Sequence, residues 1–265
     1  MSFLRSLRFV WLLTKLRLTR QMVFRLSFFG SFFADGALFL TQMLAFELIY
    51  GQVDGIGGWS RGQMMIFIGS FSMLNGLSML LCFFGLIELP RKIREGGLDL
   101  YLTKPGSPLL RICFESVDLG SAPLLLLSGL IIARGAALEG IAVSLPLLLG
   151  FIGLLLAMAL LYCDMELILR TIPFFVIAAD AINHLEGDML TLNFKIPGVL
   201  YKGGFKLLFC FALPYGLMAT VPTEALSGVL KPQGLAYALA IVAGFTAFAL
   251  WFWRLGLKNY KSASS

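Results

Sequence analysis

Long apolar runs, separated by short polar stretches, dominate the pattern of this 265-residue chain. A helix needs about 20 mostly apolar residues to cross the hydrocarbon core of a bilayer. Five runs have about this length: 26–50, 64–87, 112–133, 141–163 and 235–253. A sixth run, 207–221, is shorter and contains Pro214 and Gly216, which is typical of a short or broken membrane helix. The pattern therefore predicts an all-α integral membrane protein with six transmembrane helices.

The first 21 residues follow a different pattern, in which cations interrupt the apolar positions throughout. No uninterrupted apolar core and no small-residue cleavage site is present, so a cleaved signal peptide is not expected. Several apolar side chains share one stripe of the helical circle. We expect residues 1–21 to form an interfacial helix, with its cations near anionic headgroups. A basic extension of the first span is the alternative.

The basic residues orient the predicted spans. All but three of the 21 lysines and arginines lie at the termini or in connections that a six-span arrangement places in the cytoplasm; the exceptions are Arg61, Arg134 and Lys231. This positive-inside distribution predicts a multi-pass protein of the cell membrane with both termini cytoplasmic. In this arrangement residues 164–206 are also cytoplasmic, with a surface helix at 171–179.

Composition supports the membrane class and excludes others. Apolar residues make up 58% and charged residues 14% of the chain, whereas soluble domains contain about 45–50% and about 25%. The net charge of +6 flanks the apolar runs and forms no single basic face, so no nucleic-acid partner is expected. The four cysteines form no C-x-x-C pair and His184 is the single histidine, so we expect inert thiols and no metal site.

The polar segment 91–108 connects the second and third predicted spans. Gly96 and Gly97 permit a sharp reversal, residues 98–102 offer one to two turns with an apolar face, and the sequence KPGSP at 104–108 turns the chain back. A short apolar helix held in this way suits docking into a groove on a cytosolic partner. An ordinary loop with its leucines against the bilayer fits the pattern equally well.

Two further functions remain open from the residues alone. Asp164, Glu166 and Arg170 form a charged cluster at a predicted membrane boundary, where an integral-membrane lipid-modifying enzyme would need one. No histidine pair or nucleophile–base set accompanies them, and the chain contains no G-x-x-x-x-G-K-[ST] loop for nucleotide phosphates. A membrane scaffold without transport activity is the other alternative.

Residues 95–105, EGGLDLYLTKP, resemble the E-x-G-x-L-(D/E)-x-L-L-x-x-P segment of ABC-2 type permeases. These are the membrane subunits of ABC exporters whose ATPase is a separate chain. The sequence ALPY at 212–215, followed by Pro222, Leu226 and Gly228, is similar to the fifth span of the family and its re-entrant hairpin before span six. The ending from Trp251 to Ser264 also fits. The resemblance implies a single permease domain over residues 1–265.

The resemblance also implies partners and roles. Segment 91–108 becomes the coupling helix, in which Leu98 and Leu102 face a groove of the ATPase subunit. The coupling residues are Glu95, Gly96, Gly97, Leu98, Asp99, Leu102 and Pro105. ATP and Mg would be bound by the ATPase and no cofactor by this chain, which would catalyse nothing itself. A second permease half, either the same chain or a related one, would complete the pathway for a hydrophobic or amphipathic substrate such as a drug, natural product, lipid or peptide.

Polar residues within the spans suggest where the pathway or the dimer interface lies. An acid such as Asp35 costs about 2.5–3.5 kcal/mol at the centre of a membrane helix, which favours a position facing protein. Gln42 and Asn75 can form hydrogen bonds between helices. With Pro214 of span five, these make the predicted pathway or dimer-interface set. The predicted external gate consists of Pro222, Glu224 and Gly228.

Overall fold

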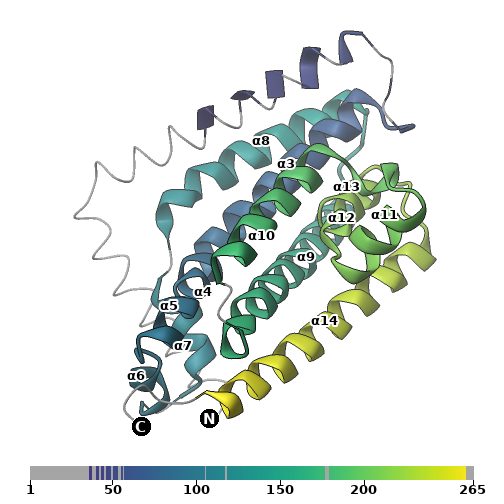
Figure 1. Cartoon of the computed structure of the whole chain (residues 1–265). Helices are drawn as coiled ribbons and strands as arrows, with labels where there is room; N and C mark the ends of the chain where they lie inside the picture. Colours follow the sequence, from purple (N-terminus) through teal and green to yellow (C-terminus); the bar gives the residue numbers. More distant parts are fainter. Residues whose placement is uncertain are drawn as a thin grey trace.

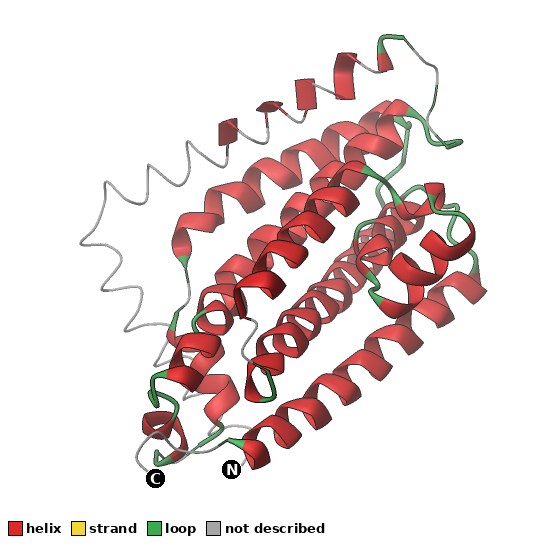
Figure 2. Cartoon of the chain, in the orientation of Figure 1, coloured by secondary structure: helices red, strands yellow, loops and turns green. Residues whose placement is uncertain are grey.

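The computed structural model describes the chain from residue 36 to residue 260, with short gaps. The gaps are residues 38, 39, 42, 45, 49, 53, 54, 56, 105, 117, 177 and 178, and the side chains of 119, 179–183 and 185 are also outside the description. Within these limits the protein is a helical bundle without strands (Figure 1, Figure 2). The predicted interfacial helix at 1–21 lies outside the described residues. The described positions between 36 and 50 are helical.

The second predicted span belongs to a longer helical stretch, Arg61–Arg94. It comprises α3 (Arg61–Ser78), the π-helical η1 (Met79–Phe83), α4 (Phe84–Ile87) and α5 (Leu89–Arg94). Ser60 starts it with a capping box: its hydroxyl accepts the Gln63 N–H, and the Gln63 side chain accepts the Ser60 N–H. The stretch begins before and ends after the predicted 64–87.

The helix predicted over 112–133 is divided in two, which corrects that span. The two helices are α7 (Pro108–Glu115) and α8 (Ala122–Leu138), and the 3-10 turn η2 (Leu119–Ser121) lies between them. At the break, the Asp118 carboxylate accepts the Gly120 N–H at 3.2 Å and the Ser121 hydroxyl at 3.1 Å. These local bonds compete with continuation of the helix, which is why an acid in an apolar run ends one element and starts the next.

The close approach of α4 to α7 requires a glycine at position 85. A Cβ atom added to Gly85 would lie 1.9 Å from the carbonyl oxygen of Ile112. No other side chain fits unless the two backbones separate. α7, which follows α5 and α6 in the chain, is thus packed directly against α4, which precedes α5.

The fourth predicted span is α9 (Leu145–Thr171), which continues beyond its predicted end at 163. Its start is capped by Ser144, whose hydroxyl accepts the Leu147 N–H. Asp164, Glu166 and Arg170 are consequently buried on the C-terminal part of this helix, and their predicted place at a membrane boundary stays a prediction. The last element, α14 (Pro232–Asn259), contains the predicted run 235–253 and lies alongside α9 (Figure 1).

Between α9 and α14 the structure departs furthest from the predicted spans. The 3-10 turn η3 (Ile172–Phe174) replaces the surface helix predicted at 171–179, and the apolar pattern did not predict α10 (Ala179–Lys195). The predicted span 207–221 is two arms, Gly203–Ala212 and Tyr215–Leu226, that meet at 77° around Pro214. Their elements, with the preceding turn, are η4 (Gly198–Leu200), α11 (Gly203–Leu207), the π-helical η5 (Leu208–Ala212), α12 (Tyr215–Met218) and α13 (Thr220–Leu226).

Two groups of buried apolar side chains hold the bundle together. The larger joins α3, α8 and α9 to α12, α13 and α14. The smaller, called the basal cluster below, lies where the C-terminal parts of α9 and α14 meet the elements from η1 to α7. Its buried members are Cys82, Leu86, Leu89, Leu98, Ile112, Leu167, Ala249 and Trp253. Cys82 and Cys163 form a disulfide between η1 and α9, which corrects the prediction of inert thiols for this pair.

Three helical stretches of the described chain are long and apolar enough to cross a membrane: Arg61–Arg94, Leu145–Phe174 and Pro232–Asn259. The bent pair makes a fourth if its two arms count as one span. The described chain is therefore that of a multi-pass membrane protein. The number six and the orientation of the termini stay predictions.

Candidate functional site

The segment between α5 and α7 reverses at Gly96. α5 ends at Glu95, and Gly96 adopts a φ of +72°, the left-handed conformation that favours glycine after a helix. Behind it, the Leu98 N–H donates to the Lys92 carbonyl at 3.1 Å. Gly97 does not adopt a positive φ, and a Cβ atom there would make ordinary contacts with Lys92. The reversal therefore depends on Gly96 alone, which refines the prediction that both glycines set it.

Leu98 faces the interior of the chain, contrary to the prediction that it faces a partner. Its side chain is 0% exposed and belongs to the basal cluster. Burial of a leucine side chain contributes about 1.5–3 kcal/mol, so Leu98 anchors the turn onto the bundle. Leu98 is the N-cap of α6 (Asp99–Leu102) and its carbonyl accepts the Leu102 N–H at 3.2 Å, so the difference in exposure between the two leucines comes from the packing of Leu98 on the bundle.

The exposed apolar side chains of α6 are Leu100 and Leu102, which are 65% and 40% exposed. Glu95, Thr103 and Lys104 are exposed around them, whereas Pro105 lies outside the described residues. Sequence reasoning missed Leu100, because two apolar residues four apart were assumed to share one helical face. Leu100 and Leu102 thus form a small exposed apolar protrusion, the knob, surrounded by the polar side chains of its rim, at one end of the bundle (Figure 1).

Polar contacts brace this knob against its neighbours. Tyr101 of α6 forms a side-chain hydrogen bond with Glu115 of α7, and the Asp99 carboxylate lies within electrostatic range of the Tyr260 phenol after α14. Burial and the bond to Glu115 raise the pKa of Tyr101 above its ordinary value, so the phenol stays protonated. Burial and the Asp99 carboxylate likewise raise the pKa of Tyr260. Asp99 thus has a partner within this chain.

Two residues of the predicted pathway or dimer-interface set, Asn75 and Pro214, are among the described residues and belong to different elements. Asn75 of α3 accepts a hydrogen bond from the Tyr162 hydroxyl of α9 at 3.3 Å, so it joins two helices of one chain. Pro214 lies at the bend of the 77° pair. Asp35 and Gln42 are outside the described residues. The role of this set in a pathway or dimer interface therefore stays a prediction.

The predicted external-gate residues fall on α13 and the turn that follows it. Pro222 is buried, Glu224 is half-buried, and Gly228 has a φ of +71°. The backbone carbonyl of Glu224 accepts the Val229 and Leu230 N–H groups, which closes the end of the helix. These contacts give Glu224 and Gly228 a structural role, and their gating role stays a prediction.

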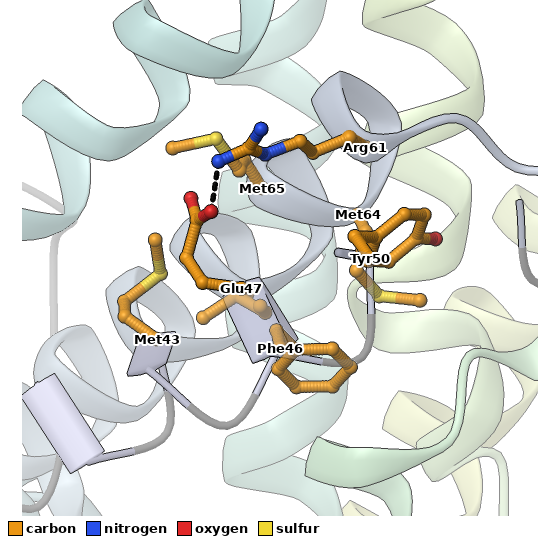
Figure 3. A pocket seen from close by; sticks show the side chains of 8 residues that line it. Met43, Phe46, Glu47, Tyr50, Arg61, Met64 and Met65 are labelled. Atoms are coloured by element: carbon orange, nitrogen blue, oxygen red, sulfur yellow. Dashed lines mark hydrogen bonds and ion pairs between the residues drawn. The ribbon is translucent and has the colours of Figure 1, made fainter. Parts of the chain in front are cut away.

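A small hollow occurs near the start of α3, at the opposite end of the helical stretch Arg61–Arg94 from the coupling segment (Figure 3). Its lining residues are Met43, Phe46, Glu47, Tyr50, Arg61, Met64, Met65 and Ile68. Figure 3 shows Glu47 and Arg61 joined at its rim by an ion pair. The lining is mostly apolar and its charged pair is mutually satisfied, so nothing in it resembles a catalytic set.

The charged residues considered for lipid chemistry are engaged inside the bundle. Thr246 of α14 donates its hydroxyl to Asp164 Oδ2 at 2.5 Å, and Arg170 pairs with Glu166. Arg170 also pairs with Glu186 of α10, a partner that sequence reasoning missed. No sequence signal indicated this second partner, because Glu166, four residues earlier on α9, already accounts for Arg170. With all of them buried, this set offers a lipid substrate no accessible acid or base.

Comparison with known proteins gives one family. A family model described as ABC-2 family transporter protein matches residues 37–264, which covers most of the chain. No curated protein and no solved structure matches significantly.

Proposed function

The chain belongs to the ABC-2 transporter family, and we propose that it is the permease subunit of an ATP-driven exporter whose ATPase is a separate chain. The family is a membrane-spanning transport component and is not itself catalytic. ATP and Mg belong to the partner subunit in this proposal. The proposed substrate is hydrophobic or amphipathic, such as a drug, natural product, lipid or peptide.

One observation carries the coupling proposal: Leu100 and Leu102 are exposed on α6 while Leu98 next to them is fully buried. A protein surface that displays two leucines on a braced turn is suited to a complementary groove. In the proposed complex these two side chains enter the ATPase subunit. Glu95 and Lys104 at the rim would add polar contacts that fix the register.

The basal cluster supports a mechanical connection between this face and the spans. Leu98 packs there with Leu167 of α9 and Trp253 of α14, the ends of two of the long apolar helices. Packed interiors transmit displacement because they have few voids. When ATP binding draws two ATPase subunits together, a force on α6 would reach α9 and α14 through this cluster. A second permease half would supply the opposite wall of the pathway.

The proposed topology keeps six crossings but assigns the fifth to α10. Glu186 of α10 pairs with Arg170 near the end of α9, and Phe194 packs on Phe71 of α3 with ring centroids 4.9 Å apart. α10 therefore extends from the C-terminal end of α9 toward the middle of α3. The bent pair then forms a re-entrant hairpin on the outer side. In this topology Lys195, Lys202 and Lys206 are assigned to the outer side together with the hairpin. Most basic residues are still assigned to the cytoplasm.

The experiment compares variants of the exposed face in a tagged permease that is expressed together with its neighbouring genes. Leu100→Asp/Leu102→Asp should remove the ATPase from the purified sample, because two charges would enter an apolar groove. Thr103→Asp, an adjacent exposed position, should retain it and serves as the matched control. Leu98 is left unchanged because a charge there would disrupt the basal cluster.

The outcomes separate the proposal from its alternatives. Loss of the ATPase in the double variant, with normal amounts of folded permease, supports the coupling face. Equal retention by both variants would refute this face. Absence of any ATPase with the unmodified chain would favour a scaffold or a membrane enzyme.

A further inference from the structure

Three buried charged side chains, called the ion cluster below, join α9 to α10. Arg170 forms ion pairs with Glu166, one helical turn earlier on α9, at 3.3 Å, and with Glu186 of α10. Arg170, Glu166 and Glu186 are 2%, 1% and 5% exposed. Two carboxylates thus share one guanidinium. If both were ionised, the cluster would hold an unbalanced negative charge in the interior, which is strongly unfavourable.

The carboxylate oxygens of the ion cluster also lack hydrogen-bond donors. Both oxygens of Glu166 and Oε1 of Glu186 are buried without a hydrogen-bond partner among the described atoms. Glu166 and Glu186 are nevertheless close enough for a side-chain hydrogen bond between them. Two ionised carboxylates can only accept hydrogen bonds. A bond between these two groups therefore requires a proton on one of them.

Among the described residues, the side chains named beside the cluster include no further cation. Tyr162 of α9 and Tyr215 of α12 lie within electrostatic range of the cluster, and both are neutral phenols. The Tyr162 hydroxyl donates to Asn75 of α3. Asp164, also on α9, is bound by Thr246 of α14 and would add a further negative charge. The described residues contain no group of His, Cys, Asp and Glu side chains with metal-binding geometry.

We propose that the ion cluster is a proton-binding site in the interior of the protein. One proton lies between the carboxyl groups of Glu166 and Glu186, donated by one to the other, while Arg170 balances the remaining negative charge. The cluster is then neutral, and the carboxyl oxygens gain the donor they lack. Release of this proton to water would leave a buried uncompensated charge.

Proton binding at this site holds α10 against α9. Stability should therefore fall as the pH rises far enough for the proton to leave, since the folded state binds a proton that is lost more easily on unfolding. A movement that carried Glu186 away from Arg170 would open the cluster to water and exchange the proton. The site stands on contacts within one chain and does not depend on the proposed ATPase coupling.

The test is infrared spectroscopy of the full-length protein in lipid nanodiscs at neutral pH. The unmodified protein should show the carbonyl stretch of a protonated carboxylic acid, and Glu166→Gln and Glu186→Gln should each lose it. Glutamine keeps the shape, and its amide can donate to the remaining carboxylate. Asp188→Asn, an exposed position on α10, should keep the band. A band that is absent from the unmodified protein, or that persists in both glutamine variants, overturns the proposal.

Thermal unfolding between neutral and alkaline pH provides a second, independent readout. The unmodified protein should lose stability as the pH rises, and Glu166→Gln should remove this part of the dependence because no shared proton remains. The measurement is repeated with sodium and with potassium at fixed pH. Stability that follows the concentration of either cation instead of the pH would overturn the proposal in favour of a metal-ion site.

Discussion

The ammonium nitrogen of Lys92 lies 4.6 Å from the ring centroid of Tyr101. The first residue belongs to α5 and the second to α6, so this cation–π contact spans the reversal at Gly96. With Leu98 buried beneath it, the contact fixes α6 relative to the end of the long Arg61–Arg94 helix. A rigid turn of this kind can transmit a force, whereas a mobile loop against the bilayer cannot.

Gly96→Ala should impair the coupling segment more than Gly97→Ala. A Cβ atom in the left-handed conformation costs about 1–2 kcal/mol, and Gly96 has a φ of +72°. Gly97 carries no such requirement, and a Cβ atom there would meet its nearest neighbour at 3.7 Å. The measurement is the ATPase activity that co-purifies with each permease variant. Equal losses in both variants would contradict the assignment of the turn to Gly96.

The Tyr101 phenol should ionise only well above pH 10. Burial and the Glu115 hydrogen bond raise its pKa, so the folded protein holds this proton more firmly than the unfolded chain. The resulting stabilisation is complete below the ordinary tyrosine pKa of about 10 and is lost as the pH rises beyond it. The tyrosinate absorbance of the unmodified protein minus that of Tyr101→Phe isolates the residue. Glu115→Gln should move its titration to lower pH, and an unchanged curve would refute the contact.

Gly85→Ala should destabilise the protein by about 1–3 kcal/mol, since its methyl group would collide with the Ile112 carbonyl and force α4 away from α7. Gly150→Ala on α9 is the matched control, because nothing lies within 4 Å of its added Cβ atom. Alanine at that helical position should be neutral or stabilising by about 0.5–1 kcal/mol. Thermal unfolding in detergent compares the two; a stable Gly85→Ala protein would contradict the packing.

A cysteine at position 202 should react from the outer side of the membrane. The proposed crossing by α10 moves this exposed residue out of the cytoplasm, whereas the apolar pattern alone placed it inside. Lys202→Cys should therefore be labelled by a membrane-impermeant maleimide in intact cells or right-side-out vesicles. Lys104→Cys should react only after permeabilisation. The labelling of the unmodified chain is subtracted to correct for its own cysteines. The opposite pattern would restore 207–221 as the fifth crossing.

The sequence was sufficient where apolar runs were long and uninterrupted. The runs 64–87 and 235–253 lie within single long helical stretches of the structure, and 141–163 does so from Leu145 onward. Their ends were less accurate because buried partners extend a helix beyond its apolar run. Asp164 and Arg170 looked like boundary residues, yet Thr246 and Glu186 accommodate them inside the bundle.

Local sequence could not reveal features that depend on distant contacts. α10 is rich in polar residues, and its contact with α9 includes the ion pair of Glu186 with Arg170, which lies in another helix. In the coupling segment, the position of the turn was predictable from its glycines. The leucine that faces inward was not predictable, because Leu98 packs in the basal cluster, whose members come from residues 82 to 253 of the chain.

A photo-crosslinking amino acid at position 100 tests the central claim most directly. It would be introduced into the tagged permease, expressed with its neighbouring genes and illuminated in the membrane, with the same probe at position 145, where Leu145 is exposed at the start of α9, as the control. We predict that position 100 forms a covalent adduct with an ATPase subunit, identified by mass spectrometry, and that position 145 forms none. Adducts of position 100 with lipid, and none with an ATPase, would contradict the coupling role of α6.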